Sequence, residues 1–182
     1  MKKILILAGS VLAVAGAAYA GPKHDHGYDM YVVADEVTDS AIYVVTHDRE
    51  TAAIEVFDND KVQWMKDGAA LKAIAKARNL YGPAEAARDK GFEFTVKDDD
   101  VKISFPVLFF KHISIHANDD NGARVNITSK NGEGDVFVRA DDGGAFITIV
   151  DASAKDARDF IDDIDDISKA VHKKMKREMG LN

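Results

Sequence analysis

The six histidines of this chain are its clearest candidates for metal chemistry, because imidazole is the commonest metal ligand in proteins. His24 and His26 flank Asp25 near the N-terminus, and such a group can hold a divalent metal weakly. The surrounding segment, residues 21–27, is polar and aperiodic, so a solvated tail is the alternative interpretation. Weak divalent-metal binding by His24 and His26 is therefore one hypothesis for this chain.

A second histidine pair, His112 and His116, lies in a segment that alternates in the manner of a β-strand. On a strand the two histidines share one face with Ser114, about 13 Å apart. Zinc binds nitrogen at about 2.0–2.1 Å, so the pair cannot share one ion. His112 and His116 remain candidates for contacting a ligand or for acid–base work.

Motifs for catalysis are missing from the sequence. The chain has no cysteine, which removes disulfides, thiolate metal sites and cysteine nucleophiles. It contains no nucleophile elbow, phosphate loop or dinucleotide fingerprint, and its acidic turns do not reproduce a calcium-binding loop. We expect no cofactor. A hydrolase that uses paired carboxylates or His112 and His116 stays open as an alternative, because 31 acidic residues offer many possible pairs.

One face of the predicted C-terminal sheet gathers positive charge. Strand alternation places five cations on this face against Glu93 and Asp135, a local net charge of +3 in an acidic protein. Such a surface favours an anionic partner, either an envelope component such as a phosphorylated glycolipid or an acidic protein. An ordinary solvated sheet face is the alternative interpretation. The cations are Lys97, Lys102, Arg124, Lys130 and Arg139, and His112 and His116 lie on the same face.

The elements that position these residues belong to an α+β fold. Apolar and polar residues alternate in about six runs between residues 92 and 150. The runs are separated by turn sequences such as Asp119–Gly122, Asn131–Gly134 and Asp141–Gly144, whose residues tolerate positive φ. The pattern predicts an antiparallel β-meander with one apolar face.

A smaller N-terminal half repeats the order of strands followed by helices. Short β-type runs cover residues 28–34, 41–46, 52–57 and 61–65. Asp67 can then cap a helix in which Leu71 and Ile74 fall at helical spacing, and residues 84–90 predict a second short helix. A boundary between two lobes is possible at residues 82–91.

The C-terminus predicts one long amphipathic helix. Ser153 and Asp156 form a start of the capping-box type, and apolar residues then follow one face from Ala157 to Met175. The acidic first half and basic second half complement a helix dipole. At 1.5 Å per residue, residues 154–179 would extend about 39 Å, enough to lie across the apolar face of the meander.

The N-terminus predicts export. Lys2 and Lys3 precede an uncharged apolar stretch, and Ala18-Tyr19-Ala20 gives a signal-peptidase site before Gly21. An uncleaved anchor is the alternative, although a membrane span needs about 20 predominantly apolar residues. We therefore expect residues 1–20 to be a cleaved signal peptide, residues 21–27 a flexible tail and residues 28–182 one α+β domain.

Together these features predict an exported protein, periplasmic or secreted, that acts as a binding or interaction module of the cell envelope and not as an enzyme. Loss of Lys2 and Lys3 changes the formal net charge from −7 to −9, which argues against nucleic acid as a partner. No membrane span is expected after cleavage. An anionic envelope component or a protein partner is expected, with the periplasmic hydrolase and the weak metal binder as alternatives.

Overall fold

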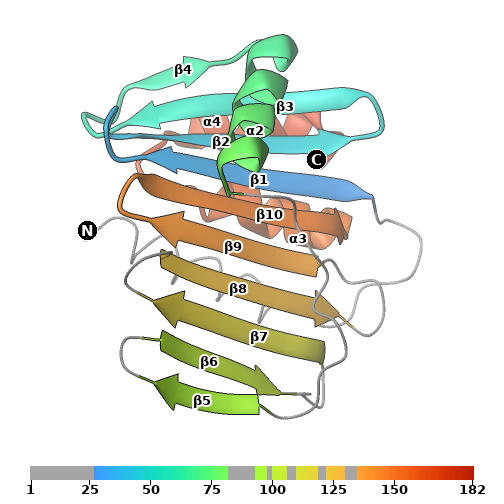
Figure 1. The fold of residues 1–182 in the computed structure, drawn as a ribbon. Coiled ribbons are helices and arrows are strands. Elements are labelled where there is room, and N and C mark those ends of the chain that lie inside the picture. Colours follow the sequence, from blue (N-terminus) through green and yellow to red (C-terminus); the bar gives the residue numbers. More distant parts are fainter. Residues whose placement is uncertain (1–26, 82–92, 98–99, 106–109, 119–121, 130–134) are drawn as a thin grey trace.

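The computed structural model describes residues 27–81, 93–97, 100–105, 110–118, 122–129 and 135–182. Within these residues ten strands form one antiparallel sheet, in the order β4-β3-β2-β1-β10-β9-β8-β7-β6-β5 (Figure 1). The α+β class and the antiparallel meander predicted from the sequence are confirmed.

The N-terminal half supplies one wing of the sheet and a helix. The strands contain runs of consecutive apolar residues, as strands covered on both faces do. They turn at aspartates that adopt positive φ, namely Asp39, Asp48 and Asp60, as tight hairpins require. The elements are β1 (Tyr28–Asp35), β2 (Ser40–His47), β3 (Glu50–Phe57), β4 (Val62–Trp64) and helix α2 (Asp67–Tyr81).

The C-terminal half supplies the other wing and two further helices. Six consecutive strands pair with their neighbours in sequence order, as the alternation of the segment predicts. The elements are β5 (Glu93–Lys97), β6 (Asp100–Phe105), β7 (Phe110–Asn118), β8 (Gly122–Ser129), β9 (Asp135–Asp141), β10 (Gly144–Ala152), α3 (Ala154–Asp162) and α4 (Lys169–Glu178).

The first and last strands join the two wings in the middle of the sheet. β1 pairs with β10 in antiparallel register, with Tyr31 opposite Thr148 and Val33 opposite Phe146. We call the contact between β1 and β10 the seam. It is apolar and shielded from solvent, since Met30, Val32 and Ile147 are almost completely buried. The two halves of the sequence are thus continuous through the hydrogen bonds of one sheet.

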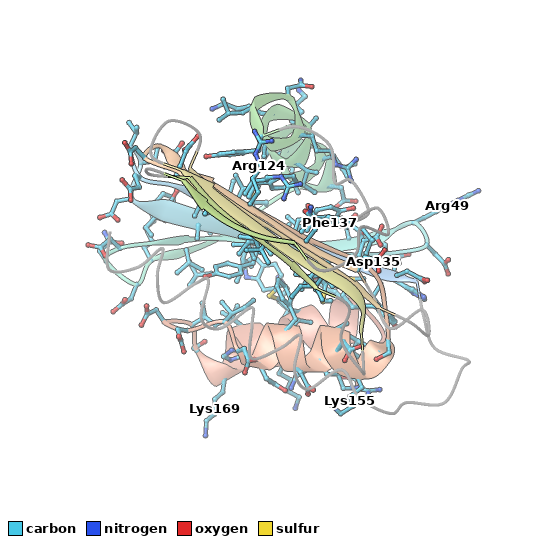
Figure 2. All side chains as sticks on the ribbon, turned by 60° about the horizontal axis from the view of Figure 1, so that its bottom comes forward. Arg49, Arg124, Asp135, Phe137, Lys155 and Lys169 are labelled. Atoms are coloured by element: carbon cyan, nitrogen blue, oxygen red, sulfur yellow. The ribbon has the colours of Figure 1, made fainter. Side chains whose placement is uncertain are left out.

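Helices cover both faces of this central region. α2 lies on one face, where Ala70, Ile74 and Ala77 pack against Tyr31 and Phe146. α3 and α4 lie on the opposite face (Figures 1 and 2), α3 against β1 and α4 against β3. Because both of its faces are covered, β10 is buried along most of its length, and even Thr148 is only 1% exposed.

The predicted apolar face of the meander exists and belongs to the main core. Val125, Ile127, Val136 and Val138 lie in one hydrophobic cluster with α3. The helix contributes Phe160 to the same cluster, with an exposed fraction of only 5%. Strand alternation therefore assigned these side chains to the correct side of the sheet.

The C-terminal helical segment differs from the prediction in being two helices. α3 ends at Asp162 with Asp163 as its C-cap, Asp166 adopts a positive φ of 62°, and Ser168 caps the start of α4. Aspartate favours caps and turns over helix interiors because its side chain competes for backbone hydrogen bonds. The reversal brings Met175 of α4 into the core, where one straight helix would overhang the sheet.

The break also changes what the charges of this segment do. The expected complementarity to the helix dipole holds at the outer ends, with Asp156 in the first turn of α3 and Lys176 and Arg177 in the last turn of α4. It is absent at the inner ends, because α3 has no basic residue in its last turn and α4 has no acidic residue in its first. The opposite charges instead meet between the helices. Lys176 Nζ donates to Asp162 Oδ1 at 2.7 Å, which joins the end of α3 to α4.

Several predicted features lie outside the described residues. They are the signal peptide, the tail with His24 and His26, the helix at 84–90, the lobe boundary at 82–91, and Lys130 of the predicted basic face. Among the helices that are described, none is both long and apolar enough to cross a membrane.

Candidate basic surface

Four of the predicted ligand-surface residues occupy one row across four adjacent strands. The register pairs Lys102 of β6 with His116 of β7, His116 with Arg124 of β8, and Arg124 with Arg139 of β9. We term these four positions, Lys102, His116, Arg124 and Arg139, the basic row. Neighbouring strands lie about 4.8 Å apart, so the basic row extends over about 14 Å.

Arg139 is the anchored end of the basic row. Its Nη1 donates to Asn126 Oδ1 at 2.8 Å and to the carbonyl oxygen of Val138 at 2.8 Å. A longer bond of 3.4 Å joins Nη1 to the carbonyl oxygen of Val125. The guanidinium is half-buried and held in place, so a ligand that meets it has less side-chain entropy to overcome.

Arg124, in the basic row, is exposed. Its side chain lies on the α2 side of the sheet, whereas Lys155 and Lys169 project from α3 and α4 on the opposite side (Figure 2). Arg124 stands directly opposite Arg139, and like charges in directly opposed cross-strand positions destabilise a sheet. An anion bound between them would remove that cost.

Lys97 and His112 share the face of the basic row without being part of it. Thr95, not Lys97, lies opposite Lys102. His112 lies opposite Thr128, four residues along β7 from His116. The structure thus aligns four of the six predicted ligand-surface residues. On the same face, Lys97 lies one position away from the row and His112 lies two positions away.

An aromatic cluster closes one end of the basic row. Arg139 is opposite Phe146 of β10, and Phe146 stacks with Tyr31 and with Tyr81 at ring-centroid distances of 6.5 and 6.4 Å. The Tyr81 hydroxyl donates to Asp141 Oδ1 at 3.3 Å. Burial, reinforced by the Asp141 carboxylate, raises the pKa of Tyr81 to about 12, so its hydroxyl stays neutral at physiological pH.

Phe137 is a residue of this face that the sequence analysis did not include, although its alternation with Asp135 and Arg139 indicates the same face. It lies on β9 between Asp135 and Arg139, with the same alternation as both. It is 5% exposed on the α2 side of the sheet (Figure 2). The alternation predicts that this face of the sheet is polar. The face is in fact apolar at Phe146 of β10 and Phe137 of β9, and the basic residues extend from β9 toward β6.

Metal ligands do not gather in the described part of the chain, where no group of three histidine or acidic side chains could hold an ion. His24 and His26 lie outside that part. The acidic residues at the end of α3 instead repel one another. Partial burial, together with the carboxylates of Asp159, Asp165 and Asp162, raises the pKa of Asp163.

Comparison of the chain with protein-family models, with curated proteins and with solved structures gives no match.

Proposed function

We propose that this chain is an exported, non-enzymatic binding protein of the cell envelope whose basic row receives clustered phosphate groups. The protein acts outside the cytoplasm, periplasmic or secreted, after its signal peptide is removed. The partner is an anionic envelope component, and the shared chemistry is the phosphate, whether it is carried by a lipid headgroup or by a soluble polymer.

The observation that carries the proposal is the alignment of the basic row. Four adjacent strands each contribute a basic residue at the same level of the sheet, in a chain whose formal net charge is −7. Arg124 and Arg139 are directly opposed and carry like charges, so an anion that lies between them is bound favourably by both. Positive charge concentrated in this way on an acidic protein attracts an anion locally and repels it elsewhere.

The extent of the row indicates a multivalent anionic partner, and phosphate is the anionic group that we propose. A guanidinium presents a planar fork that binds phosphate or carboxylate oxygens in pairs. A row of about 14 Å requires several anionic groups in succession, which phosphorylated glycolipids and polymers provide on neighbouring units. Asn126, on the same face, adds a polar group that already orients Arg139.

The test is calorimetric titration of the purified protein with inorganic polyphosphate and with vesicles of phosphatidylglycerol, at low and high salt. The variant combines Lys102→Gln with Arg124→Gln. A cation close to an anionic surface contributes about 1 kcal/mol, so the double variant should bind about 30-fold more weakly. Binding by the unmodified protein should weaken as salt rises.

Lys169→Gln is the matched control, because Lys169 is exposed and lies on the opposite side of the molecule (Figure 2). It should bind as the unmodified protein does. Equal binding by the double variant and the control would overturn the proposal, as would the absence of binding to both probes. Equal or tighter binding of polyglutamate would reassign the surface to an acidic protein. Binding of vesicles but not of polyphosphate would identify the lipid headgroup as the phosphate source.

Export is tested separately. After expression of the full sequence in a Gram-negative host, the protein should be recovered from the periplasmic fraction with Gly21 as its first residue. N-terminal sequencing and intact mass report this directly. Recovery from the cytoplasm with Met1 retained would contradict the proposal.

A further inference from the structure

The sheet ends in two edge strands of different character. β4, at one end, spans only Val62–Trp64, whereas β5 at the other spans Glu93–Lys97 (Figure 1). In the described part of the chain, β5 pairs on one side only, with β6. An edge strand presents backbone donors and acceptors to any strand that can align with it. A three-residue edge is blunted by its shortness, but β5 is long enough to pair.

The sequence of β5 is self-complementary when two copies run antiparallel. Its five residues are Glu93, Phe94, Thr95, Val96 and Lys97. A two-fold axis through Thr95 sets Glu93 opposite Lys97 of the second copy, and Phe94 opposite Val96 of the second copy. Opposite charges in directly opposed positions stabilise an antiparallel pair, and an aromatic residue beside a β-branched one does the same.

A single lysine on an edge strand commonly prevents such pairing. Here the lysine is matched by a glutamate at the symmetric position, so the same charge that would repel an arbitrary strand attracts a second copy in one register. A shift of the register by two residues would leave Glu93 or Lys97 without its partner, which favours the symmetric arrangement.

We infer that two copies of this chain pair through β5 into an isologous dimer with one continuous sheet. Residues opposed across an antiparallel pair lie on the same face, so the faces that carry the two basic rows coincide. Thr95 lies opposite Lys102, at the level of the basic row. The two rows therefore lie in line on either side of the dimer axis, with Thr95 of each copy between them and the two Lys102 positions about 14 Å apart.

The joined rows would extend about 43 Å across ten strand positions, at about 4.8 Å per strand. This consequence rests on the proposed function, whereas the dimer itself does not. A polyanion or a charged surface could then contact both rows at once, so the second contact would be intramolecular and the apparent affinity would rise.

The strand contact is small, because only five residues on each side pair. Interfaces at the low end of the size range form transient complexes, so we expect a dissociation constant on the order of 10 µM. The test is sedimentation velocity of the purified protein from about 1 to 200 µM, without any polyanion. The unmodified protein should pass from monomer to dimer over this range.

Charge reversal tests the register. Glu93→Lys alone places Lys against Lys at both symmetric positions, and Lys97→Glu alone places Glu against Glu, so each should weaken self-association about 30-fold. Mixing the two single variants restores both opposite-charge pairs and should restore the dimer. Lys169→Glu, with the same change in net charge as Lys97→Glu on a distant helix, should dimerise normally. Circular dichroism verifies that each variant is folded.

A protein that stays monomeric at every concentration would overturn the inference. A dimer that the reversals leave unchanged would overturn it too, as would a mixture of the two variants that stays monomeric. Polyphosphate titration of the monomeric Glu93→Lys variant, which keeps every cation of the face, separates this result from the proposed function. If this variant still binds, but more weakly than the dimer, the basic row binds polyphosphate and the dimer extends the binding surface. If the unmodified protein dimerises and neither form binds, only the proposed function fails.

Discussion

At the scale of single residues, Gly144 shows how closely the two halves of the sheet approach. Gly144 begins β10 with a φ of +150°, and a Cβ placed on it would lie 2.1 Å from the carbonyl oxygen of Ala34 on β1. Both the backbone angle and the contact disfavour a side chain, because L-residues rarely adopt this conformation. The atom that blocks the space is backbone, so no side chain can rotate away to make room.

We therefore expect Gly144→Ala to reduce the free energy of unfolding by about 2–4 kcal/mol, measured by urea denaturation. Gly68→Ala is the matched control, because a Cβ at Gly68 meets nothing within 4 Å and lies in the first turn of α2. It should be neutral or should stabilise the protein by about 0.5 kcal/mol. A Gly144→Ala protein as stable as the unmodified one would contradict the β1–β10 register.

At the scale of elements, the connection between α3 and α4 concentrates negative charge where it is unfavourable. Asp163 is the C-cap of α3, and a carboxylate at a helix C-terminus opposes the dipole. Its partial burial and the neighbouring carboxylates raise its pKa above the usual 3.8. The folded state therefore holds the Asp163 proton more tightly than the unfolded state does. This protonation contributes fully to the free energy of unfolding below the ordinary pKa, and the contribution is lost as pH rises through the raised pKa.

Asp163→Asn should therefore stabilise the protein near neutral pH, where the carboxylate is charged, and the gain should shrink as pH falls toward 3.8. Urea midpoints at the two pH values measure the difference. Asp162→Asn provides the contrast, because Asp162 accepts from Lys176. Since exposed ion pairs contribute about 0–1 kcal/mol, its removal should be neutral or slightly destabilising at neutral pH. A loss of stability in Asp163→Asn at neutral pH would contradict the assignment.

The sequence predicts the strands of this fold better than its helices, for a physical reason. A strand shows its buried face by alternation, and Val125 and Val138 obey that rule even though they lie on different strands. The reversal between α3 and α4 leaves the apolar spacing nearly unchanged, because both helices pack on the same core. The local signals of the break were Ser168, a residue type that caps helices, and the aspartates before it.

The candidate surface was predictable as a face but not as a row. Alternation alone assigns Lys102, His116 and Arg124 to one side of the sheet. Their alignment depends on the hairpin registers, which loop length and turn type set. The aromatic boundary at Tyr81 was not predictable either, because it depends on which face of the sheet α2 crosses.

At the scale of the whole molecule, the pairing of β1 with β10 couples the unfolding of the N-terminal half to that of the C-terminal half. The main hydrophobic cluster contains Val45 and Ile54 from the N-terminal half together with Ile127 and Val136 from the C-terminal half. Neither half can expose its share of this cluster without opening the β1–β10 seam. We therefore expect the two halves to unfold in one cooperative transition, as small single domains generally do.

Trp64, the one tryptophan of the chain, reports on this coupling. It lies on β4 with Lys174 Nζ 3.6 Å from its ring centroid, so its fluorescence follows the N-terminal half and α4, whereas circular dichroism follows all strands. The two transitions in urea should coincide. Ile127→Ala, on the other wing at β8, removes a side chain that is only 4% exposed. It should shift both transitions equally, by about 2–5 kcal/mol. If Ile127→Ala leaves the urea transition of Trp64 fluorescence unchanged, the two wings unfold independently. A side chain can affect a distant probe at equilibrium only when both belong to one cooperative unit.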